Sequence, residues 1–383
     1  MTSFDVVRQY NFPTTIRFGA GASEELGPHL KGAGFSRPLV VTDPTVRDLT
    51  FFKKILADLE RLGLKPDVFS NIHKNPVKSD VLAGKQAFQD AGADCIVGIG
   101  GGAGMDVARA ITLSIHHHRD LFDYDDLIGG DKYVTEEVPY FVTLPTTSGT
   151  GSEVGRSAII SEDDTHRKRI LFSPKLLAKM VFADPVLTMD LPPFVTAATG
   201  MDALTHNMEA YIAKGFHPMC EGIALQGMTL ISESIVQATT APDLASRSKM
   251  MIASLMGAVA FQKGLGIVHS LAHPLSSLLD THHGLANAIN LPYGMNFNAP
   301  GFEPAFQRMA QAMGVKGEDS ASLITYLFDL NQQLGLPENL GAIGVKEEHL
   351  ETLATLAEAD FCHPNNPKPV TREDFLAIYK QAL

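Results

Sequence analysis

Five residues in the second half of the chain carry side chains of the types that bind a metal ion. Asp202 and His206 lie four residues apart in a helical segment, so both project from one helix face at chelate spacing. His269 and His273 repeat this offset, and His283 follows after a turn. A single histidine of this kind is more often a hydrogen-bonded core residue. Four imidazoles and one carboxylate, without a thiolate, favour a divalent ion such as Fe²⁺ or Zn²⁺.

Two loops in the first half have the composition of phosphate-binding loops. The run from Gly98 to Asp106 is rich in glycine, follows a strand and opens a helix, where bare amides and a helix N-terminus can hold phosphate. A structural tight turn is the alternative, because the match to the dinucleotide fingerprint is loose. The run from Pro145 to Glu153 also follows a strand and is dense in hydroxyls that can donate to phosphate or ribose. Two such loops on one sheet favour a nucleotide.

Asp43 stands at the end of an early strand, where a carboxylate can accept hydrogen bonds from a ribose diol. The same charge would repel the additional phosphate of NADP, so NAD is the predicted dinucleotide. The alternative role for Asp43 is a helix N-cap before Pro44 and Thr45.

The overall composition is that of an ordinary globular protein, 45% hydrophobic and 19% charged. The net charge of −12 argues against nucleic acid and anionic membranes, so small molecules are the expected partners. Three scattered cysteines support neither a disulfide framework nor a cysteine metal site. The N-terminus lacks the pattern of a signal peptide, and no apolar run approaches the roughly 18 residues of a membrane span. A cytoplasmic location is therefore expected.

The elements that position these residues change character near residue 190. Before it, β-branched runs at 38–43, 93–100, 139–145 and 180–185 alternate with amphipathic segments, which predicts a mostly parallel sheet covered by helices. After it, the pattern is helical throughout, with runs at 194–213, 222–237, 244–261 and 347–357. We predict an α/β dinucleotide-binding domain over residues 1–190 and an all-α metal- and substrate-binding domain over residues 191–383, joined at Leu191-Pro192-Pro193.

Read in order, these motifs resemble the iron-containing alcohol dehydrogenase family over essentially the whole chain. The motifs are the glycine loop, Pro-Thr-Thr-Ser-Gly-Thr-Gly, Gly-Met-Asp-Ala-Leu-Thr-His, His-Ser-Leu-Ala-His-Pro and a closing Asn-Pro-Lys. The resemblance implies the dehydroquinate synthase-like fold of that family and a homodimer. It also implies an iron-dependent enzyme that transfers a hydride between NAD(H) and a small primary alcohol or aldehyde.

The resemblance also implies roles for individual residues. By motif, Asp202, His206, His269 and His283 match the four metal ligands, and His273 matches a catalytic histidine beside substrate and nicotinamide. The positions that match dinucleotide contacts are Asp43, Gly100, Gly101, Gly102, Asp106, Thr146, Thr147, Thr150 and Lys168. The chain departs from the family pattern at Ala103, Arg109 and Gly155, where serine, lysine and threonine are common. Backbone amides can still bind a pyrophosphate after these changes.

Lys263 suggests a substrate class. The run from Phe261 to Gly266, followed by the His269 motif, looks like the 4-hydroxybutyrate dehydrogenase branch of the family. A cation near the metal would pair with a distal carboxylate of such a substrate. The alternative is that Lys263 reaches solvent or forms a structural salt bridge.

Two other functions use part of the same evidence. A zinc-dependent glycerol or polyol dehydrogenase would share the fold and the hydride chemistry but differ in metal ligation. A metal-dependent hydrolase without a nucleotide would use the same histidines, but it would leave the glycine and hydroxyl loops unexplained.

Overall fold

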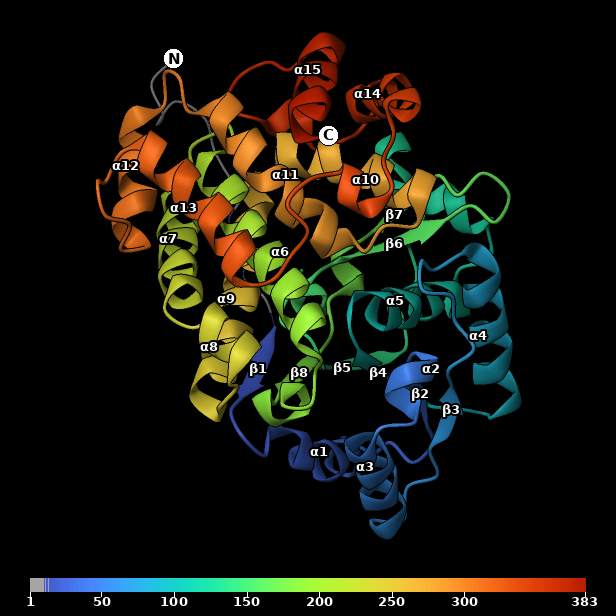
Figure 1. Cartoon of the computed structure of the whole chain (residues 1–383). Helices are drawn as coiled ribbons and strands as arrows, with labels where there is room; N and C mark the ends of the chain where they lie inside the picture. Colours follow the sequence, from blue (N-terminus) through green and yellow to red (C-terminus); the bar gives the residue numbers. More distant parts are fainter. Residues whose placement is uncertain (1–9, 11, 13) are drawn as a thin grey trace. The chain divides into compact units, whose positions relative to one another are not determined.

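The computed structural model describes residues 10, 12 and 14–383 (Figure 1). These residues form two compact units. One, called the sheet unit here, holds residues 14–147 and 151–190; the other, called the helical unit, holds residues 148–150 and 191–383 together with Tyr10 and Phe12. The predicted fold class, a mostly parallel sheet followed by an all-helical half, is confirmed. The assignment of dinucleotide and metal binding to these halves stays a prediction.

The sheet unit contains a six-stranded sheet in the order β1-β8-β5-β4-β2-β3, in which every described pairing is parallel. Its strands are β1 (Thr15–Phe18), β2 (Pro38–Val41), β3 (Asp67–Phe69), β4 (Cys95–Gly100), β5 (Tyr140–Pro145) and β8 (Met180–Ala183). The four predicted runs are β2, β4, β5 and β8. The two edge strands β1 and β3 are short and largely exposed, so they lack the apolar run that identifies the central strands.

An antiparallel hairpin of β6 (Ser157–Ser161) and β7 (Lys168–Phe172) completes the strands of this unit. Its helices are α1 (Leu26–Gly32), α2 (Pro44–Arg47), α3 (Thr50–Arg61), α4 (Lys78–Asp90) and α5 (Gly102–His116). Strands β2 and β4 are buried along their whole length, as expected for parallel strands that helices cover on both faces. Helix α3 buries Phe52, Ile55 and Leu59, which lie three and four residues apart and so share one face.

The helical unit is built around α6 (Pro193–Ile212), of which residues 196–212 are all buried. Its other helices are α7 (Pro218–Ser232), α8 (Ile235–Thr240), α9 (Leu244–Ala260), α10 (Ile267–Leu279), α11 (His283–Asn298), α12 (Glu303–Ala312), α13 (Ser320–Gln333), α14 (Leu350–Glu358) and α15 (Arg372–Ala382). Helices α7, α9 and α11 all pack against α6, which explains why this 20-residue helix is buried on almost every side (Figure 1). The predicted run at 222–237 is divided between α7 and α8.

Among the described residues, no single helix has the length and apolar character of a membrane span. The segments Leu244–Lys263 and Ile267–Leu279 reach that length and apolar character only as a pair, and they are bent by 107° at the break between them.

A buried arginine fixes the segment that follows the hydroxyl-rich loop within the sheet unit. Arg109 on α5 is fully buried and donates to Ser152 Oγ at 3.0 Å, to Ser157 O at 2.8 Å and to Asp106 Oδ1 at 3.2 Å. It also donates to the Ser152 carbonyl and to Leu176 O. The planar guanidinium can satisfy several acceptors at once, which a lysine ammonium at this position could not do with the same geometry.

Glu153 lies beside this arginine as a second buried charge. Its side chain is 3% exposed, and Oε1 accepts no hydrogen bond from any described residue. Burial raises the pKa of Glu153 to about 7, although the nearby Arg109 acts in the opposite direction.

Glu153 should therefore make stability depend on pH. A raised folded-state pKa stabilises the fold below the unfolded value, and this contribution is lost as pH rises from about 4.5 through about 7. We expect Glu153→Gln to remove this loss, so that the variant gains about 3 kcal/mol on the wild type between pH 4.5 and pH 8. Urea unfolding at several pH values measures the difference. Glu136→Gln, at an exposed site, is the control, and parallel pH curves for wild type and Glu153→Gln would contradict this prediction.

Candidate metal centre and dinucleotide loops

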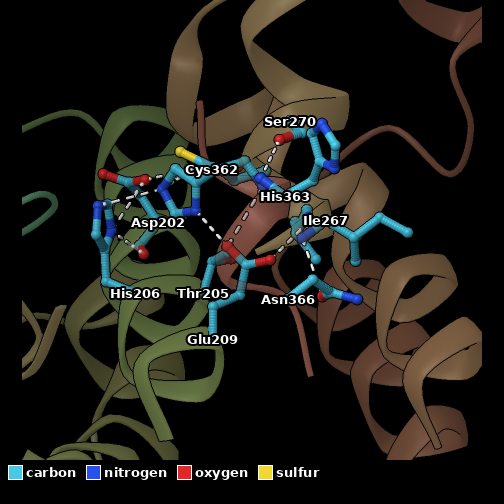
Figure 2. A network of polar contacts seen from close by, with 12 residues as sticks. Asp202, Thr205, His206, Glu209, Ile267, Ser270, Cys362, His363 and Asn366 are labelled. Atoms are coloured by element: carbon cyan, nitrogen blue, oxygen red, sulfur yellow. Dashed lines mark hydrogen bonds and ion pairs between the residues drawn. The ribbon is translucent and has the colours of Figure 1, made fainter. Parts of the chain in front are cut away.

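Helix α6 presents three ionisable side chains on one buried face. Asp202, His206 and Glu209 are separated by four and three residues, which returns each to the same side of a helix of 3.6 residues per turn (Figure 2). Their exposures are 3%, 2% and 1%. Groups of this type are buried in proteins only when hydrogen bonds, charges or a metal ion compensate them.

Two further helices bring the remaining predicted ligands to this face. His269 lies in the first turn of α10, and His283 is the first residue of α11. Gly284 makes the approach of α11 possible, because a Cβ at this position would lie 2.4 Å from the Ala198 carbonyl oxygen of α6. No other residue type fits there without moving a helix.

The predicted ligand atoms converge. The Nε2 atoms of His206 and His269 are 3.2 Å apart, and one Asp202 oxygen lies 3.5 Å from His283 Nε2. Ligand atoms of Asp202, His269 and His283 all lie within 4.8 Å of one another. The structure therefore places the four predicted ligands of this unit, including His206, in one cluster.

The hydrogen bonds of the ring nitrogens determine which atoms are free to bind a metal. His206 Nδ1 is 2.8 Å from the Asp202 carbonyl oxygen, and His269 Nδ1 is 2.6 Å from Glu209 Oε2. Both oxygens can only accept, so each Nδ1 carries the hydrogen and each Nε2 presents a lone pair. Burial lowers the pKa of His206 to about 4, which keeps that ring neutral. Two facing lone pairs repel unless a cation lies between them.

Asn287, one turn after His283 on α11, lies among the same atoms. Its Nδ2 donates to Asp202 Oδ1 at 2.7 Å and is 3.2 to 3.3 Å from Nε2 of His283 and of His269. An amide nitrogen has two hydrogens, whereas this cluster presents more than two acceptors. The donor set therefore fits a divalent cation, since nitrogens that bind one ion at ~2.1 Å lie roughly 3.0 to 3.4 Å apart.

The loop residues 148–150 also belong to the helical unit and contact α6. Thr150 Oγ1 donates to Asp202 Oδ2 at 2.8 Å. A Cβ at Gly149 would lie 3.2 Å from the same carboxylate oxygen, so a side chain there would crowd Asp202. Thr150 is predicted as a dinucleotide contact, but its hydroxyl hydrogen is directed to the Asp202 carboxylate, which it holds in place.

His273 belongs to a second cluster, on the same side of α10. Its Nδ1 lies 2.7 Å from Asp360 Oδ2, and its ring stacks on His283 with centroids 5.3 Å apart. Asp360 also accepts from Ser270 Oγ at 2.6 Å and from Cys362 N at 2.9 Å. Burial opposes the charged carboxylate, but His273 and these donors hold the pKa of Asp360 at about 2. The carboxylate therefore fixes the hydrogen of His273 on Nδ1 and leaves Nε2 available.

In the sheet unit, the predicted dinucleotide residues gather at the carboxyl ends of β2, β4 and β5. A Cβ at Gly100 would lie 3.5 Å from Asp43 Oδ2, and one at Gly101 would lie 3.3 Å from the Thr147 side chain. Thr146 N donates to Gly100 O at 3.0 Å, so the two loops are hydrogen-bonded to each other. This edge is where open parallel sheets bind nucleotides.

The N-terminus of α5 at this edge is open. Its N-cap, Gly101, makes no side-chain capping hydrogen bond, and nothing lies within 4 Å of a Cβ built at the exposed Gly102. The first amides of the 15-residue helix are therefore free of a side-chain cap, as an anion site at a helix N-terminus requires.

Asp43 combines the two roles that its sequence position left open. Its Oδ1 accepts from the backbone amides of Thr45 and Val46, both at 2.9 Å, so it is the N-cap of α2. Its Oδ2 is the atom nearest Gly100 and makes no described hydrogen bond within the chain.

Two other predicted dinucleotide residues lie in the interior network of the sheet unit. Asp106 accepts from Arg109 and Ser152 through Oδ1 and from Ile159 N through Oδ2, so its carboxylate fixes α5 to the hairpin. These contacts give a cofactor role for that carboxylate no support. Lys168 is the first residue of β7, and its charge acts to lower the pKa of Asp106, which burial raises overall.

Lys263 forms the structural salt bridge that the sequence left as an alternative. Its Nζ donates to the Tyr211 carbonyl at 2.7 Å and to Glu221 Oε1 at 2.9 Å, and its side chain is 5% exposed. The predicted substrate contact of Lys263 is not supported, because its ammonium group already neutralises an internal carboxylate and caps the end of α6.

Sequence reasoning missed Glu209, Asn287 and Asp360. Glu209 carries a detectable signal, a carboxylate on an apolar helix at helical spacing from Asp202 and His206. Asn287 has a weaker one, at four residues from His283. Asp360 lies 87 residues from His273, and no local pattern joins them.

Comparison with known proteins agrees with these observations. A protein-family model described as iron-containing alcohol dehydrogenase matches residues 13–185. A second family model, for the C-terminal part of the Fe-containing alcohol dehydrogenase family, matches residues 196–383. The chain is 37% identical to 4-hydroxybutyrate dehydrogenase of Cupriavidus necator, over 97% of this chain and 98% of the relative. It is 32% identical to lactaldehyde reductase of Escherichia coli K12, over 96% and 97% of the two chains.

Solved structures give the same result. A structure of alcohol dehydrogenase from Oenococcus oeni is 30% identical and superposes with a TM-score of 0.93, covering 98% of this chain and all of that one. A structure of 1,3-propanediol oxidoreductase, 32% identical over the same shares, also has a TM-score of 0.93. The chain therefore belongs to the iron-containing alcohol dehydrogenase family and is an oxidoreductase.

Proposed function

We propose that this chain interconverts a small primary alcohol and its aldehyde, with NAD(H) as hydride carrier. The proposal includes a divalent ion, with Fe²⁺ as the preferred candidate, and its ligands are Asp202, His206, His269 and His283. The observation that carries the proposal is the 3.2 Å distance between Nε2 of His206 and Nε2 of His269, beside a buried carboxylate. A zinc-dependent polyol dehydrogenase is the main competitor. The alternative of a hydrolase that binds no nucleotide does not explain why the N-terminus of α5 lacks a side-chain cap.

The metal ligands would hold the ion in a fixed and largely dry setting. When bound, a divalent ion acts as a Lewis acid that lowers the pKa of an alcohol and polarises a carbonyl. His206 and His269 meet it through Nε2, because their Nδ1 atoms are held by oxygen acceptors. Asn287 and Thr150 orient the Asp202 carboxylate from its two oxygens. Zn²⁺ or another divalent ion would suit the same atoms.

His273 would handle the proton that alcohol oxidation releases. Asp360 holds the hydrogen on Nδ1, so Nε2 is the atom that takes a proton in oxidation and returns it in reduction. His273 is 16% exposed at its side chain, so a proton accepted there can pass on to solvent. The carboxylate stabilises the charged ring during that exchange.

The sheet unit would bind the dinucleotide through its loops at the carboxyl ends of β2, β4 and β5. The open amides of α5 suit the pyrophosphate, and Asp43 Oδ2 suits a ribose diol. NAD supplies the hydride acceptor when bound. A homodimer and a cytoplasmic location remain predictions from the sequence.

A 4-hydroxybutyrate-type substrate is the second, narrower candidate. Its support is the 37% identity to the 4-hydroxybutyrate dehydrogenase of Cupriavidus necator, against 32% to lactaldehyde reductase. We do not propose Lys263 as the group that binds its carboxylate, because that lysine is paired with Glu221.

The proposed ligand set is tested by measuring the metal content of a variant at His283. Its side chain is 28% exposed, whereas those of its partners are nearly fully buried, so His283→Ala should lose the ion and keep the fold. We expect about one ion per wild-type chain, much less in the variant, and a metal-dependent rise in Tm only for the wild type. His282→Asn, which preserves the N-cap of α11, is the control. Full occupancy in His283→Ala would exclude His283 as a ligand.

Cofactor selectivity tests Asp43. We expect kcat/KM with NADH to exceed that with NADPH by about 5- to 150-fold, which corresponds to about 1 to 3 kcal/mol, since Asp43 places a charge near the 2′-phosphate. Asp43→Ser should remove most of this preference and still cap α2, so the loss of charge is separated from loss of the cap. Asp48→Ser, at the other end of α2, should leave the gap unchanged. A wild-type preference for NADPH would refute the role of Asp43.

Substrate preference tests the narrower candidate. If a 4-hydroxybutyrate-type alcohol is the substrate, its wild-type kcat/KM exceeds that of 1-butanol. We expect Lys263→Met to leave this ratio unchanged and to lower stability by about 1 to 3 kcal/mol, because it leaves the Tyr211 carbonyl and Glu221 without their donor. Steady-state kinetics at fixed ionic strength and urea unfolding decide both points. If Lys263→Met is as stable as the wild type and loses the preference for 4-hydroxybutyrate over 1-butanol, Lys263 contacts the substrate after all.

A further inference from the structure

Glu209 is a buried carboxylate that none of the predicted functions uses. It is 1% exposed and lies on α6 one turn beyond His206 (Figure 2). Figure 2 shows its carboxylate directed away from Asp202, toward Ile267 of α10 and toward Asn366. A carboxylate this deep in an apolar helix bundle is unfavourable unless nearby groups compensate its charge.

All described hydrogen bonds of the Glu209 side chain are with N–H donors of the first turn of α10. Oε1 accepts from Val268 N at 2.6 Å, and Oε2 accepts from His269 N at 3.4 Å and His269 Nδ1 at 2.6 Å. The first amides of α10 carry the positive end of the helix dipole, which favours a negative group at this place. Gly266 leaves space for it, since a Cβ there would lie 3.0 Å from Oε1.

These contacts require a carboxylate rather than an amide. Both Glu209 oxygens act as acceptors, so replacing either with an NH₂ group would set a donor against a donor. The hydrogen bond from His269 Nδ1 to Glu209 Oε2, at 2.6 Å, also makes Nε2 a stronger electron-pair donor.

We infer that Glu209 is a positioning residue of the metal centre: it fixes His269 as the Nδ1–H tautomer and directs Nε2 to the ion. This inference rests on the metal site proposed above. His206 differs, because its Nδ1 is held by a neutral backbone carbonyl of its own helix. Of these two histidines, His269 is therefore the one whose donor strength depends on a residue outside its own helix, and metal affinity is coupled to the packing of α10 on α6.

The test is metal affinity in Glu209→Gln. Gln keeps the size of the side chain but puts an amide hydrogen against either Val268 N or His269 Nδ1. In the second case, His269 accepts this hydrogen at Nδ1 and carries its own on Nε2, the wrong tautomer for ligation. Competition between apoprotein and a chromophoric chelator for Zn²⁺ or Co²⁺ should show 10- to 100-fold weaker binding.

Two variants separate this role from simple destabilisation. Asp360→Asn makes the same carboxylate-to-amide change beside His273, which is not one of the four proposed ligands, and should keep the wild-type affinity within about twofold. Asn366→Ala removes the acceptor of Ile267 N at 3.2 Å, so it weakens the cap of α10 without touching His269. It should lower Tm and leave metal affinity close to wild type.

Each outcome has one meaning. Affinity that falls in Glu209→Gln alone supports the inference, and wild-type affinity in Glu209→Gln, or an equal loss in Asn366→Ala, overturns it. If Glu209→Gln does not fold, Glu209→Asp takes its place and should bind less tightly than wild type. Nitrogen-15 NMR of the Zn²⁺-loaded wild type gives an independent result, since a hydrogen on His269 Nε2 would also overturn it. Absence of metal binding by the wild type would instead refute the proposed function.

Discussion

Burial of the polar face of α6 is the constraint on which the helical unit depends. Asp202, His206 and Glu209 are each less than 4% exposed, in a helix surrounded by apolar side chains. Taking a carboxylate out of water costs several kcal/mol unless donors or a cation replace its hydration. Every segment that packs on this face therefore has to bring a matching polar group, and the arrangement of the neighbouring helices follows from that requirement.

The neighbours meet this requirement in three ways. Helix α10 brings its first turn, whose free amides and His269 ring satisfy Glu209. Helix α11 brings Asn287 to one oxygen of Asp202, and the loop at Thr150 supplies a donor to the other. Close contact between the helices depends on glycine residues, most clearly on Gly284, where a Cβ would overlap the backbone of α6. The lone pairs on the two facing histidine Nε2 atoms have no positively charged partner among the described residues, and a cation fits between them.

The sequence was informative where a local pattern carries the structural information. The four-residue offset of Asp202 and His206 and the apolar strands β2, β4, β5 and β8 could be predicted for this reason. Lys263 shows the limit of the same reasoning. Its neighbours in sequence resemble a family branch, but its partner Glu221 lies 42 residues away and occupies the ammonium group.

Contacts between residues far apart in the sequence also limit what could be predicted from local patterns. Asp106 was matched by motif to the cofactor, but its oxygens face Arg109, Ser152 and the amide of Ile159, which lies 53 residues away. The chain departs from the family pattern at Arg109 itself, and this residue accounts for much of that network. A residue that departs from the family pattern can thus hydrogen-bond to a neighbour that retains the family motif, which no single-position comparison reveals.

Under the proposed function, the two histidine–carboxylate pairs of α10 separate metal binding from proton transfer along one helix. His269 and His273 are one turn apart, and each gives its Nδ1 hydrogen to a carboxylate, at 2.6 Å to Glu209 and at 2.7 Å to Asp360. Their surroundings differ. His269 is 1% exposed and its Nε2 faces His206, so a proton could neither leave nor arrive there easily. The His273 side chain is 16% exposed, so under the proposed function its Nε2 would exchange a proton with the substrate and then with water. The same kind of pair would then support a fixed lone pair in one turn and a mobile proton in the next, and the difference in burial separates the two proposed roles.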